Sequence, residues 1–396
     1  MNLVNFSIPL GKNRAVRLPV LLWFTLVFAV VLKKLYGHSY NNYLIFKGVF
    51  WHTIDQSNLF SAYPAEHFDV NHYGPFFSVI IAPFALLPAD LGVVVWCLLN
   101  AFVLFYAIRK LPVSSHFQLT ILLIAAIEMM TSLYSEQINP MLAGWFILAF
   151  VLTEKGKDFW ATLFIAAGFM IKIYGIAGLL FFVFSKNKLQ FGLSFIFWVA
   201  VMFFLPMLFS SPAFIIHSYS DWWQVLVEKN IQNTDHSLAS NMQDISVMGF
   251  IRRIFQIRAS INLFVLVPAA LMIVLPLLRF QQYKFLLYRL SFLAIALISV
   301  VIFSTSAESP SYVIAVTGAA LWYTIYPHGN WSFVLLLLLF LLTILSPTDL
   351  FPKYIKVHYI KPYSLKALPC ILIWLILIRN VAFKNFSRVK SPALNA

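Results

Sequence analysis

The stretch that decides the fold is DFWATLFIAAGFMIKIYGIAGLLFFVF, residues 158–184. It is apolar almost from end to end, and one lysine, Lys172, interrupts it. An apolar run of about 20 residues is long enough to cross the hydrocarbon core of a bilayer. An ionisable side chain at membrane depth is costly and needs a partner or a function. The stretch therefore predicts two short membrane segments that meet at a hinge at Lys172.

Comparable runs recur from one end of the chain to the other. Of the 396 residues, 61% are hydrophobic and only 11% are charged, whereas soluble domains carry about 25% charged residues. This pattern predicts an all-α polytopic membrane protein with about 11–13 transmembrane helices, in a single integral membrane domain over residues 1–396. Spans are expected at about 18–36, 91–108, 117–133, 138–153, 158–171, 173–184, 190–209, 260–278, 286–304, 310–326, 331–346 and 367–383, and the proline-broken segment 76–88 is expected to be re-entrant or interfacial.

The positive charge of the chain predicts how it is oriented in the membrane. The net charge is +14, and most Lys and Arg residues lie at the ends of apolar runs. Such placement is typical of cytoplasmic loops and of contact with anionic lipid headgroups, so we do not expect a nucleic-acid partner. One side then carries most of the basic loops. The lysines within 353–366 fall on the opposite, outer side and are an exception to the rule.

On this map two long loops, about 37–75 and 210–259, face outward and carry scarce polar residues. The first contains Glu66, His67 and Asp69 just ahead of Tyr73. Carboxylates at a lipid–water boundary suit a site that handles a polar group carried on a lipid, although the same residues are ordinary in a solvated loop. Further candidates on the outer side, expected to bind substrate, are Tyr73, Glu136, Gln137, Asn139, Lys172, Asn241, Asp244, Ser246, Arg252, Arg253, Glu308 and Ser309.

Each of these candidates also has a purely structural interpretation. Lys172 could form an ion pair with an acid such as Glu136, and Glu308 could cap the helix that follows it. Arg252 and Arg253 could belong to an interfacial helix with a polar N-terminus instead of contacting a lipid phosphate. Two acids and one histidine in a loop fall short of a metal-ligand set, so we expect no metal and no cofactor.

Taken together, these motifs resemble glycosyltransferase family 87, a group of mannosyltransferase-like membrane enzymes with the GT-C fold. The resemblance runs from about residue 18 to about 330. It rests on Tyr73–Gly74–Pro75, on the turn from Glu136 to Asn139, and on AAGFMIK, which ends at Lys172. It rests also on NMQDISVMG, residues 241–249, and on Ser309–Pro310. The form of these motifs is similar to a Bacteroidetes-type branch of the family.

The resemblance implies transfer of a hexose, such as mannose, from a polyprenyl-phosphate sugar to a lipid or glycan acceptor. The reaction would take place on the outer face of a bacterial inner membrane. A carboxylate would accept the acceptor's proton, and cations would stabilise the departing phosphate. We expect Asp69 or Glu66 to be the base, and Lys172 with Arg252 or Arg253 to supply the cations.

One departure from the family pattern leaves alternatives open. The family usually places an aspartate soon after its first span, where this chain has Asn41 and Asn42. Asparagine cannot accept a proton, so these two residues are expected to contact substrate while another carboxylate acts as the base. A catalytically inactive member of the family, or a transporter of a lipid-linked sugar, is the alternative. Paired broken helices in two matching halves, which are typical of transporters, are not evident in the sequence.

Overall fold

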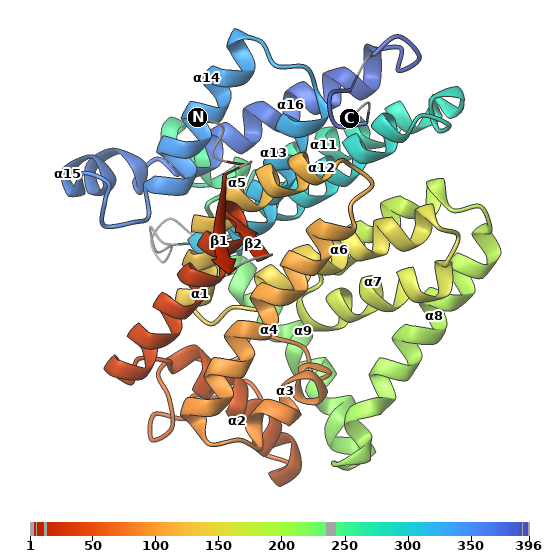
Figure 1. The fold of residues 1–396 in the computed structure, drawn as a ribbon. Helices are drawn as coiled ribbons and strands as arrows, with labels where there is room; N and C mark the ends of the chain where they lie inside the picture. The colour runs from red at the N-terminus through yellow and green to blue at the C-terminus, as the bar shows by residue number, and fades with distance from the viewer. Residues whose placement is uncertain (1–3, 5, 12–13, 235–242, 390, 395–396) are drawn as a thin grey trace. The chain divides into compact units, whose positions relative to one another are not determined.

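The structure, a computed structural model, describes residues 4, 6–11, 14–234, 243–389 and 391–394 (Figure 1). Almost all of the secondary structure in this part of the chain is helical. The exception is an antiparallel hairpin near the N-terminus, formed by β1 (Ser7–Gly11) and β2 (Arg14–Arg17). This hairpin was not predicted from the sequence.

Apolar helices dominate the described residues, and five of them are long and apolar enough to cross a membrane. These five are α1 (Leu18–Gly37), α4 (Ala89–Lys110), α5 (Ser115–Tyr134), α8 with its short continuation (Lys188–Leu208) and α16 with its preceding turn (Leu365–Phe383). Five shorter apolar helical segments are α6 (Asn139–Glu154), Tyr174–Phe184, α11 and its extension (Asn262–Leu278), α12 (Leu286–Ile302) and α14 with its extension (Asn330–Leu345). Two further apolar helices are α7 (Asp158–Lys172) and α13 (Tyr312–Ile325). The prediction of an all-α polytopic membrane protein is confirmed.

Two segments that were predicted as outer loops contain helices, and their position on the outer side stays a prediction. The segment 37–75 contains α2 (Asn41–Asp55). The segment 210–259 contains α9 (Pro212–Thr234) and α10 (Val247–Phe255). Helices α2 and α9 were not predicted, because polar residues interrupt the apolar ones in both segments. A helix that contains Arg252 and Arg253 was one of the interpretations that the sequence left open. The segment 76–88 holds the short helix α3 (Phe77–Ala85), which contains Pro83.

The chain divides by its internal contacts into two compact units. Unit 1 comprises residues 1–26, 108–132 and 230–396, and unit 2 comprises residues 27–107 and 133–229. The single domain over residues 1–396 stays a prediction.

The core of unit 1 is built from α12, α13 and α16, which pack against one another. Almost every side chain of α12 and α13 is buried. Gly318 allows α13 to approach α12 closely, because a Cβ at that position would lie 2.9 Å from the carbonyl oxygen of Ala294. The short helix α15 (Lys353–Ile355) precedes a further helical turn in the lysine-rich segment.

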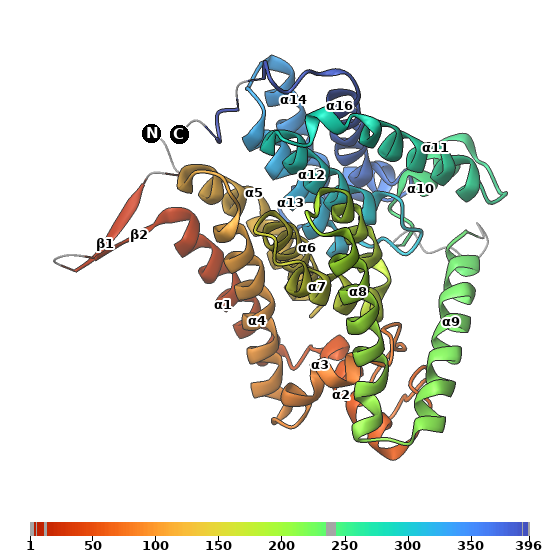
Figure 2. The ribbon, with the colours of Figure 1, turned by 90° about the vertical axis from the view of Figure 1, so that its right-hand side faces the viewer.

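The core of unit 2 is built from α6, α7 and α8, with α7 packed against both of the others (Figure 2). Helix α7 ends at Lys172, and Ile173 takes a left-handed conformation with φ 46°. The chain then turns back as a 3₁₀ helix along α7, which confirms the predicted break at Lys172. Gly175 makes this turn possible, since a Cβ there would lie 2.2 Å from the backbone nitrogen of Phe169.

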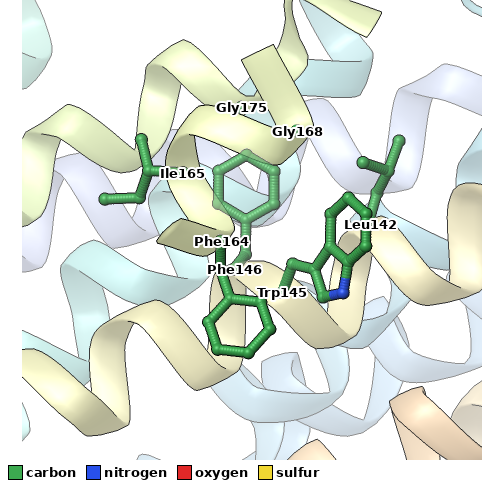
Figure 3. A pocket seen from close by; sticks show the side chains of 7 residues that line it. All are labelled: Leu142, Trp145, Phe146, Phe164, Ile165, Gly168 and Gly175. Carbon is green, nitrogen blue, oxygen red and sulfur yellow. The ribbon is translucent and has the colours of Figure 1, made fainter. Parts of the chain in front are cut away.

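A small apolar pocket lies between α6 and α7 in unit 2 (Figure 3). Its walls are aromatic and aliphatic side chains together with the two glycines of the turn-back: Leu142, Trp145, Phe146, Phe164, Ile165, Gly168 and Gly175. The pocket therefore adjoins the turn that follows Lys172.

Candidate functional site

The loop between α2 and α3, residues 56–76, carries three of the predicted site residues of unit 2, namely Glu66, Asp69 and Tyr73. Its end is fixed on two helices. The Gly74 nitrogen donates to the carbonyl oxygen of Ile171 at 3.0 Å, and the Trp222 indole donates to the carbonyl oxygen of His72 at 3.1 Å. Only glycine fits at position 74, because a Cβ would lie 2.2 Å from the Met170 carbonyl oxygen. The loop is thereby held against the C-terminus of α7 and against α9.

Lys172 lies within a cage of amide oxygens and aromatic rings. Its ammonium group donates to Asn139 Oδ1 at 3.0 Å and reaches Gln137 Oε1 at 3.5 Å. It also lies 5.5 Å from the centre of the Tyr73 ring and 5.2 Å from that of Tyr174. The Tyr73 hydroxyl donates to the same Gln137 oxygen at 2.7 Å. Four residues selected from the sequence are thus brought together from three separate segments.

His72 lies beside this cage and was not selected from the sequence as a site residue. The pKa of His72 is lowered to about 4, first by burial and then by the positive charge of Lys229. The Asp69 carboxylate opposes this shift, and Lys172 adds to it. Within the described part of the chain, His72 Nδ1 is buried and has no hydrogen-bond partner. His72 is therefore a neutral imidazole on which the charges of two lysines and a carboxylate act.

Asp69 is exposed and lies in the left-handed region, with φ 77°. Its Oδ1 accepts a hydrogen bond from the Val70 nitrogen at 2.8 Å, and its carbonyl oxygen is 3.1 Å from His67 Nδ1. Next to it, Asn41 binds both backbone groups of Phe68, accepting at 2.7 Å and donating at 2.5 Å. Asn41 therefore fixes the conformation of the loop at Asp69, a role that the sequence did not indicate.

Glu66, the alternative base, belongs to a different local cluster. His52 Nε2 lies 3.1 Å from Glu66 Oε2, and the Glu66 side chain is 51% exposed while that of His52 is 9% exposed. The His52 ring stacks on Tyr63, with ring centres 3.9 Å apart. A carboxylate with one face held by an imidazole and the other open to solvent can accept a proton.

Glu136 forms an ion pair with Lys34 at 2.6 Å, and both side chains are buried. Burial raises the pKa of the Glu136 carboxyl, and the Lys34 ammonium opposes that shift. The carbonyl oxygen of Glu136 accepts from the Trp96 indole at 2.7 Å, and Asn42 donates to the Ser135 carbonyl oxygen at 2.8 Å. Glu136 and Asn42 thus stabilise the turn that presents Gln137 and Asn139. The ion pair of Glu136 with Lys34 replaces the pairing with Lys172 that the sequence left open.

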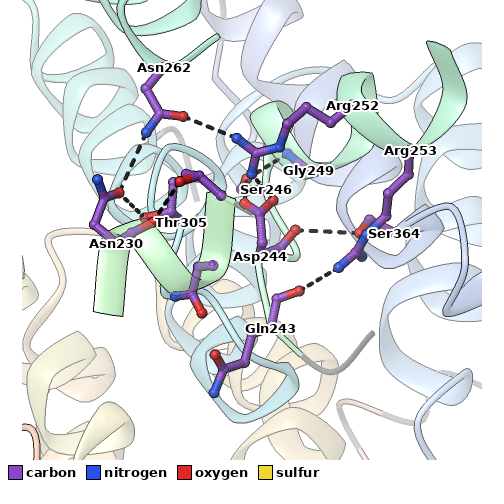
Figure 4. A network of polar contacts seen from close by, with 12 residues as sticks. Asn230, Gln243, Asp244, Ser246, Gly249, Arg252, Arg253, Asn262, Thr305 and Ser364 are labelled. Atoms are coloured by element: carbon purple, nitrogen blue, oxygen red, sulfur yellow. Dashed lines mark hydrogen bonds and ion pairs between the residues drawn. The ribbon is translucent and has the colours of Figure 1, made fainter. Parts of the chain in front are cut away.

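Unit 1 contains a second polar cluster, around α10 (Figure 4). Arg252 forms an ion pair with Asp244, and Arg253 donates to Ser364 and to the carbonyl oxygen of Gln243. Both guanidinium groups are buried, and Arg253 is only 8% exposed. Burial raises the pKa of Asp244, an effect that hydrogen bonds and the charge of Arg252 oppose. The predicted contact of these arginines with a phosphate stays a prediction, and it would require this network to open.

Two other predicted residues of unit 1, Ser246 and Glu308, each directly precede a helical segment. Ser246 is the N-cap of α10, where its hydroxyl accepts from the Gly249 nitrogen at 3.0 Å. Glu308 Oε1 accepts from the Gln243 side chain at 3.3 Å and makes no cap hydrogen bond to the turn that it precedes. Asn241 lies outside the residues that the structure describes.

Ser309 joins a buried ion pair that the sequence did not indicate. Lys366 Nζ lies 2.7 Å from Glu128 Oε1 and 2.9 Å from Ser309 Oγ, and both charged side chains are buried. The prediction for the lysines of 353–366 was their place on the outer side, and the structure adds that the Lys366 side chain is buried. Glu128 could have indicated this pair from the sequence, because an acid inside an apolar run needs a buried partner of opposite charge.

Comparison with protein-family models gives a match to part of the chain. The sequence model of glycosyltransferase family 87 matches residues 71–305, which include His72, Tyr73, Lys172 and both arginines of α10. Asp69 and Glu66 precede the matched region, and Glu308 and Ser309 follow it. No curated protein matches the chain. Among the described residues, no set of three His, Cys, Asp or Glu side chains is placed to hold a metal ion.

Proposed function

The chain belongs to glycosyltransferase family 87 and is a membrane glycosyltransferase, and we propose that it transfers a hexose from a polyprenyl-phosphate donor to a lipid or glycan acceptor. The observation that carries this proposal is the fixed ammonium group of Lys172 in unit 2, close to His72, on which the charges of Lys229 and Asp69 also act. Two cations and a carboxylate are the groups that such a transfer requires.

The cations act on the phosphate of the donor. As the bond between the anomeric carbon and the phosphate oxygen breaks, the polyprenyl phosphate gains a second negative charge. Positive groups that are already in place stabilise this charge without having to reorganise. Lys172 is suited to the task because Asn139, Gln137 and the two tyrosine rings hold its ammonium group in position.

The carboxylate acts on the acceptor. A new bond forms between the acceptor oxygen and the anomeric carbon, and the hydroxyl proton passes to the base. We assign this base to Asp69, because its charge acts on the same histidine as those of Lys172 and Lys229. Glu66 is the alternative, since its exposed oxygen is also able to accept a proton. The departing phosphate is a weak base and needs no general acid.

A transfer assay tests the proposal. The purified protein in proteoliposomes is supplied with radiolabelled polyprenyl-phosphate hexoses and a membrane lipid extract from its source. We expect label to move from the donor to a new lipid or glycan product. In the same vesicles, a flippase would instead carry the labelled donor across the bilayer without forming a product. Movement without any product would support the transporter alternative and contradict the proposal.

The location of the reaction on the outer face is also part of the proposal, and we place it on the inner membrane of a bacterium. Support comes from the basic residues, which gather in loops on the opposite side of the predicted topology. The expected result is that a cysteine at exposed Ser61, in the loop 56–76, reacts with a membrane-impermeant maleimide added to intact cells. A cysteine at exposed Lys186, before α8, should react only after permeabilisation. The native Cys97 and Cys370 are buried and give little background. The reverse labelling pattern would place the site on the cytoplasmic face.

A further inference from the structure

One imidazole nitrogen of His72 makes no hydrogen bond within the described part of the chain. Nδ1 is buried and has no hydrogen-bond partner among the described residues, although the backbone on both sides is firmly held. The Trp222 indole binds the His72 carbonyl oxygen, and Asn71 bonds to both backbone groups of Tyr73. A buried nitrogen without a partner carries a free-energy cost that a fold normally avoids, unless a ligand supplies the partner.

The charges around His72 identify the chemistry of such a ligand. The charges of Lys172 at the end of α7, of Lys229 on α9 and of Asp69 in the same loop all act on the His72 imidazole. The two lysines make the surroundings favourable for an anion and unfavourable for an imidazolium ion. An anion that binds between the lysines makes the imidazolium form of His72 favourable again, because its negative charge stabilises a proton on the nearby nitrogen.

We propose that His72 takes up a proton from solvent when the donor's phosphate binds between Lys172 and Lys229, and that its Nδ1–H then donates a hydrogen bond to that phosphate. The inference rests on the proposed function, because it assigns the donor phosphate to this site. The proton is held while the glycosidic bond forms and the phosphate gains charge. It returns to solvent, or leaves on the phosphate, when polyprenyl phosphate is released.

Proton uptake makes binding dependent on pH in a defined direction. In the free protein His72 is neutral above about pH 5, since its pKa is lowered to about 4. If the bound anion raises the pKa of His72, the affinity for the anion must increase as the pH falls from the pKa of the bound state to that of the free protein. Linkage limits this increase to about tenfold per pH unit for a single proton.

Calorimetry tests the proposal with farnesyl methyl phosphate as the probe. This diester lacks the second ionisation near pH 6 that a phosphate monoester would add. Binding at about pH 6 is measured in two buffers with different ionisation heats, which yields the number of protons taken up. We expect uptake approaching one proton per site in the wild type. We also expect an affinity that rises as the pH is lowered.

The variants separate this inference from the proposed function. His72→Asn keeps a polar group near Nδ1 but cannot titrate, so it should bind the probe with no proton uptake and with an affinity that does not change with pH. His217→Asn, a control on α9 whose side chain is 74% exposed, should behave as the wild type. Binding that needs Lys172 but takes up no proton, or uptake that survives in His72→Asn, would overturn the inference alone. Undiminished binding by Lys172→Ala would overturn both the inference and the proposed donor site.

Discussion

Replacement of Lys172 by alanine is expected to lower the rate of sugar transfer by about 10²–10³-fold or more, since it removes a positioned charge from the departing phosphate. The cage explains why the effect should be large. Asn139, Gln137 and two tyrosine rings hold the ammonium group in position before the donor binds. The site of the wild type therefore needs little reorganisation during the reaction. Turnover and donor affinity are measured separately in the transfer assay.

Two further variants make this expectation specific. Lys172→Arg should retain part of the activity, because the charge remains but the planar guanidinium fits the cage differently. Lys157→Ala removes an exposed lysine that directly precedes the opposite end of the same helix and should leave transfer unchanged. Wild-type turnover in Lys172→Ala, with the protein folded, would exclude Lys172 from the reaction.

Much of the membrane architecture could be predicted, because charged residues are costly in a bilayer and the spanning segments are therefore long apolar runs. The predicted segment ends lie within a few residues of those of α1, α4, α5 and α16. Lys172 was identified for the same reason, as a single charge in an apolar run. The turn from Glu136 to Asn139 stood out because polar residues follow directly after the apolar segment of α5.

The features that were missed depend on contacts between distant parts of the chain. Lys366 and Glu128 are 238 residues apart, and no local pattern joins them. Lys229 had no recognisable role while α9 was taken as a loop. The signal that could have revealed α9 is a spacing of three to four residues, because Ile215, Trp222 and Leu226 face inward while Trp223 and Val227 are exposed.

His72 was missed for a related reason. In the sequence it is one of several polar residues in a loop, and an exposed histidine would look the same. Its distinguishing property is a buried, unpartnered nitrogen near two lysines from separate helices, and this property exists only in the folded unit. Asn41 was expected to contact substrate, and the structure shows it bound to the backbone of Phe68.

Asp69→Asn is expected to lower turnover by about 10²–10⁴-fold with little change in donor binding, because a general base contributes on that scale. The fold should tolerate the change well. Asparagine is among the residues most often found at positive φ, and its Oδ1 can keep the hydrogen bond from the Val70 nitrogen. The loss would then report on proton transfer. Turnover and donor affinity are measured as for Lys172, with Asp55→Asn, an exposed acid at the end of α2, as the matched control.

The comparison of Asp69→Asn with Glu66→Gln decides which carboxylate is the base. In Glu66→Gln the side-chain oxygen can still accept from His52, so the local structure should remain while the proton acceptor is lost. A large loss of turnover in Asp69→Asn with a small loss in Glu66→Gln supports Asp69 as the base. This is the expected result, since the charge of Asp69 acts on His72 together with those of Lys172 and Lys229. The opposite pattern assigns the base to Glu66 and its His52 partner. Full activity in both variants would mean that neither carboxylate of the loop accepts the proton, and the loop would then serve only to hold Tyr73 and His72 in place.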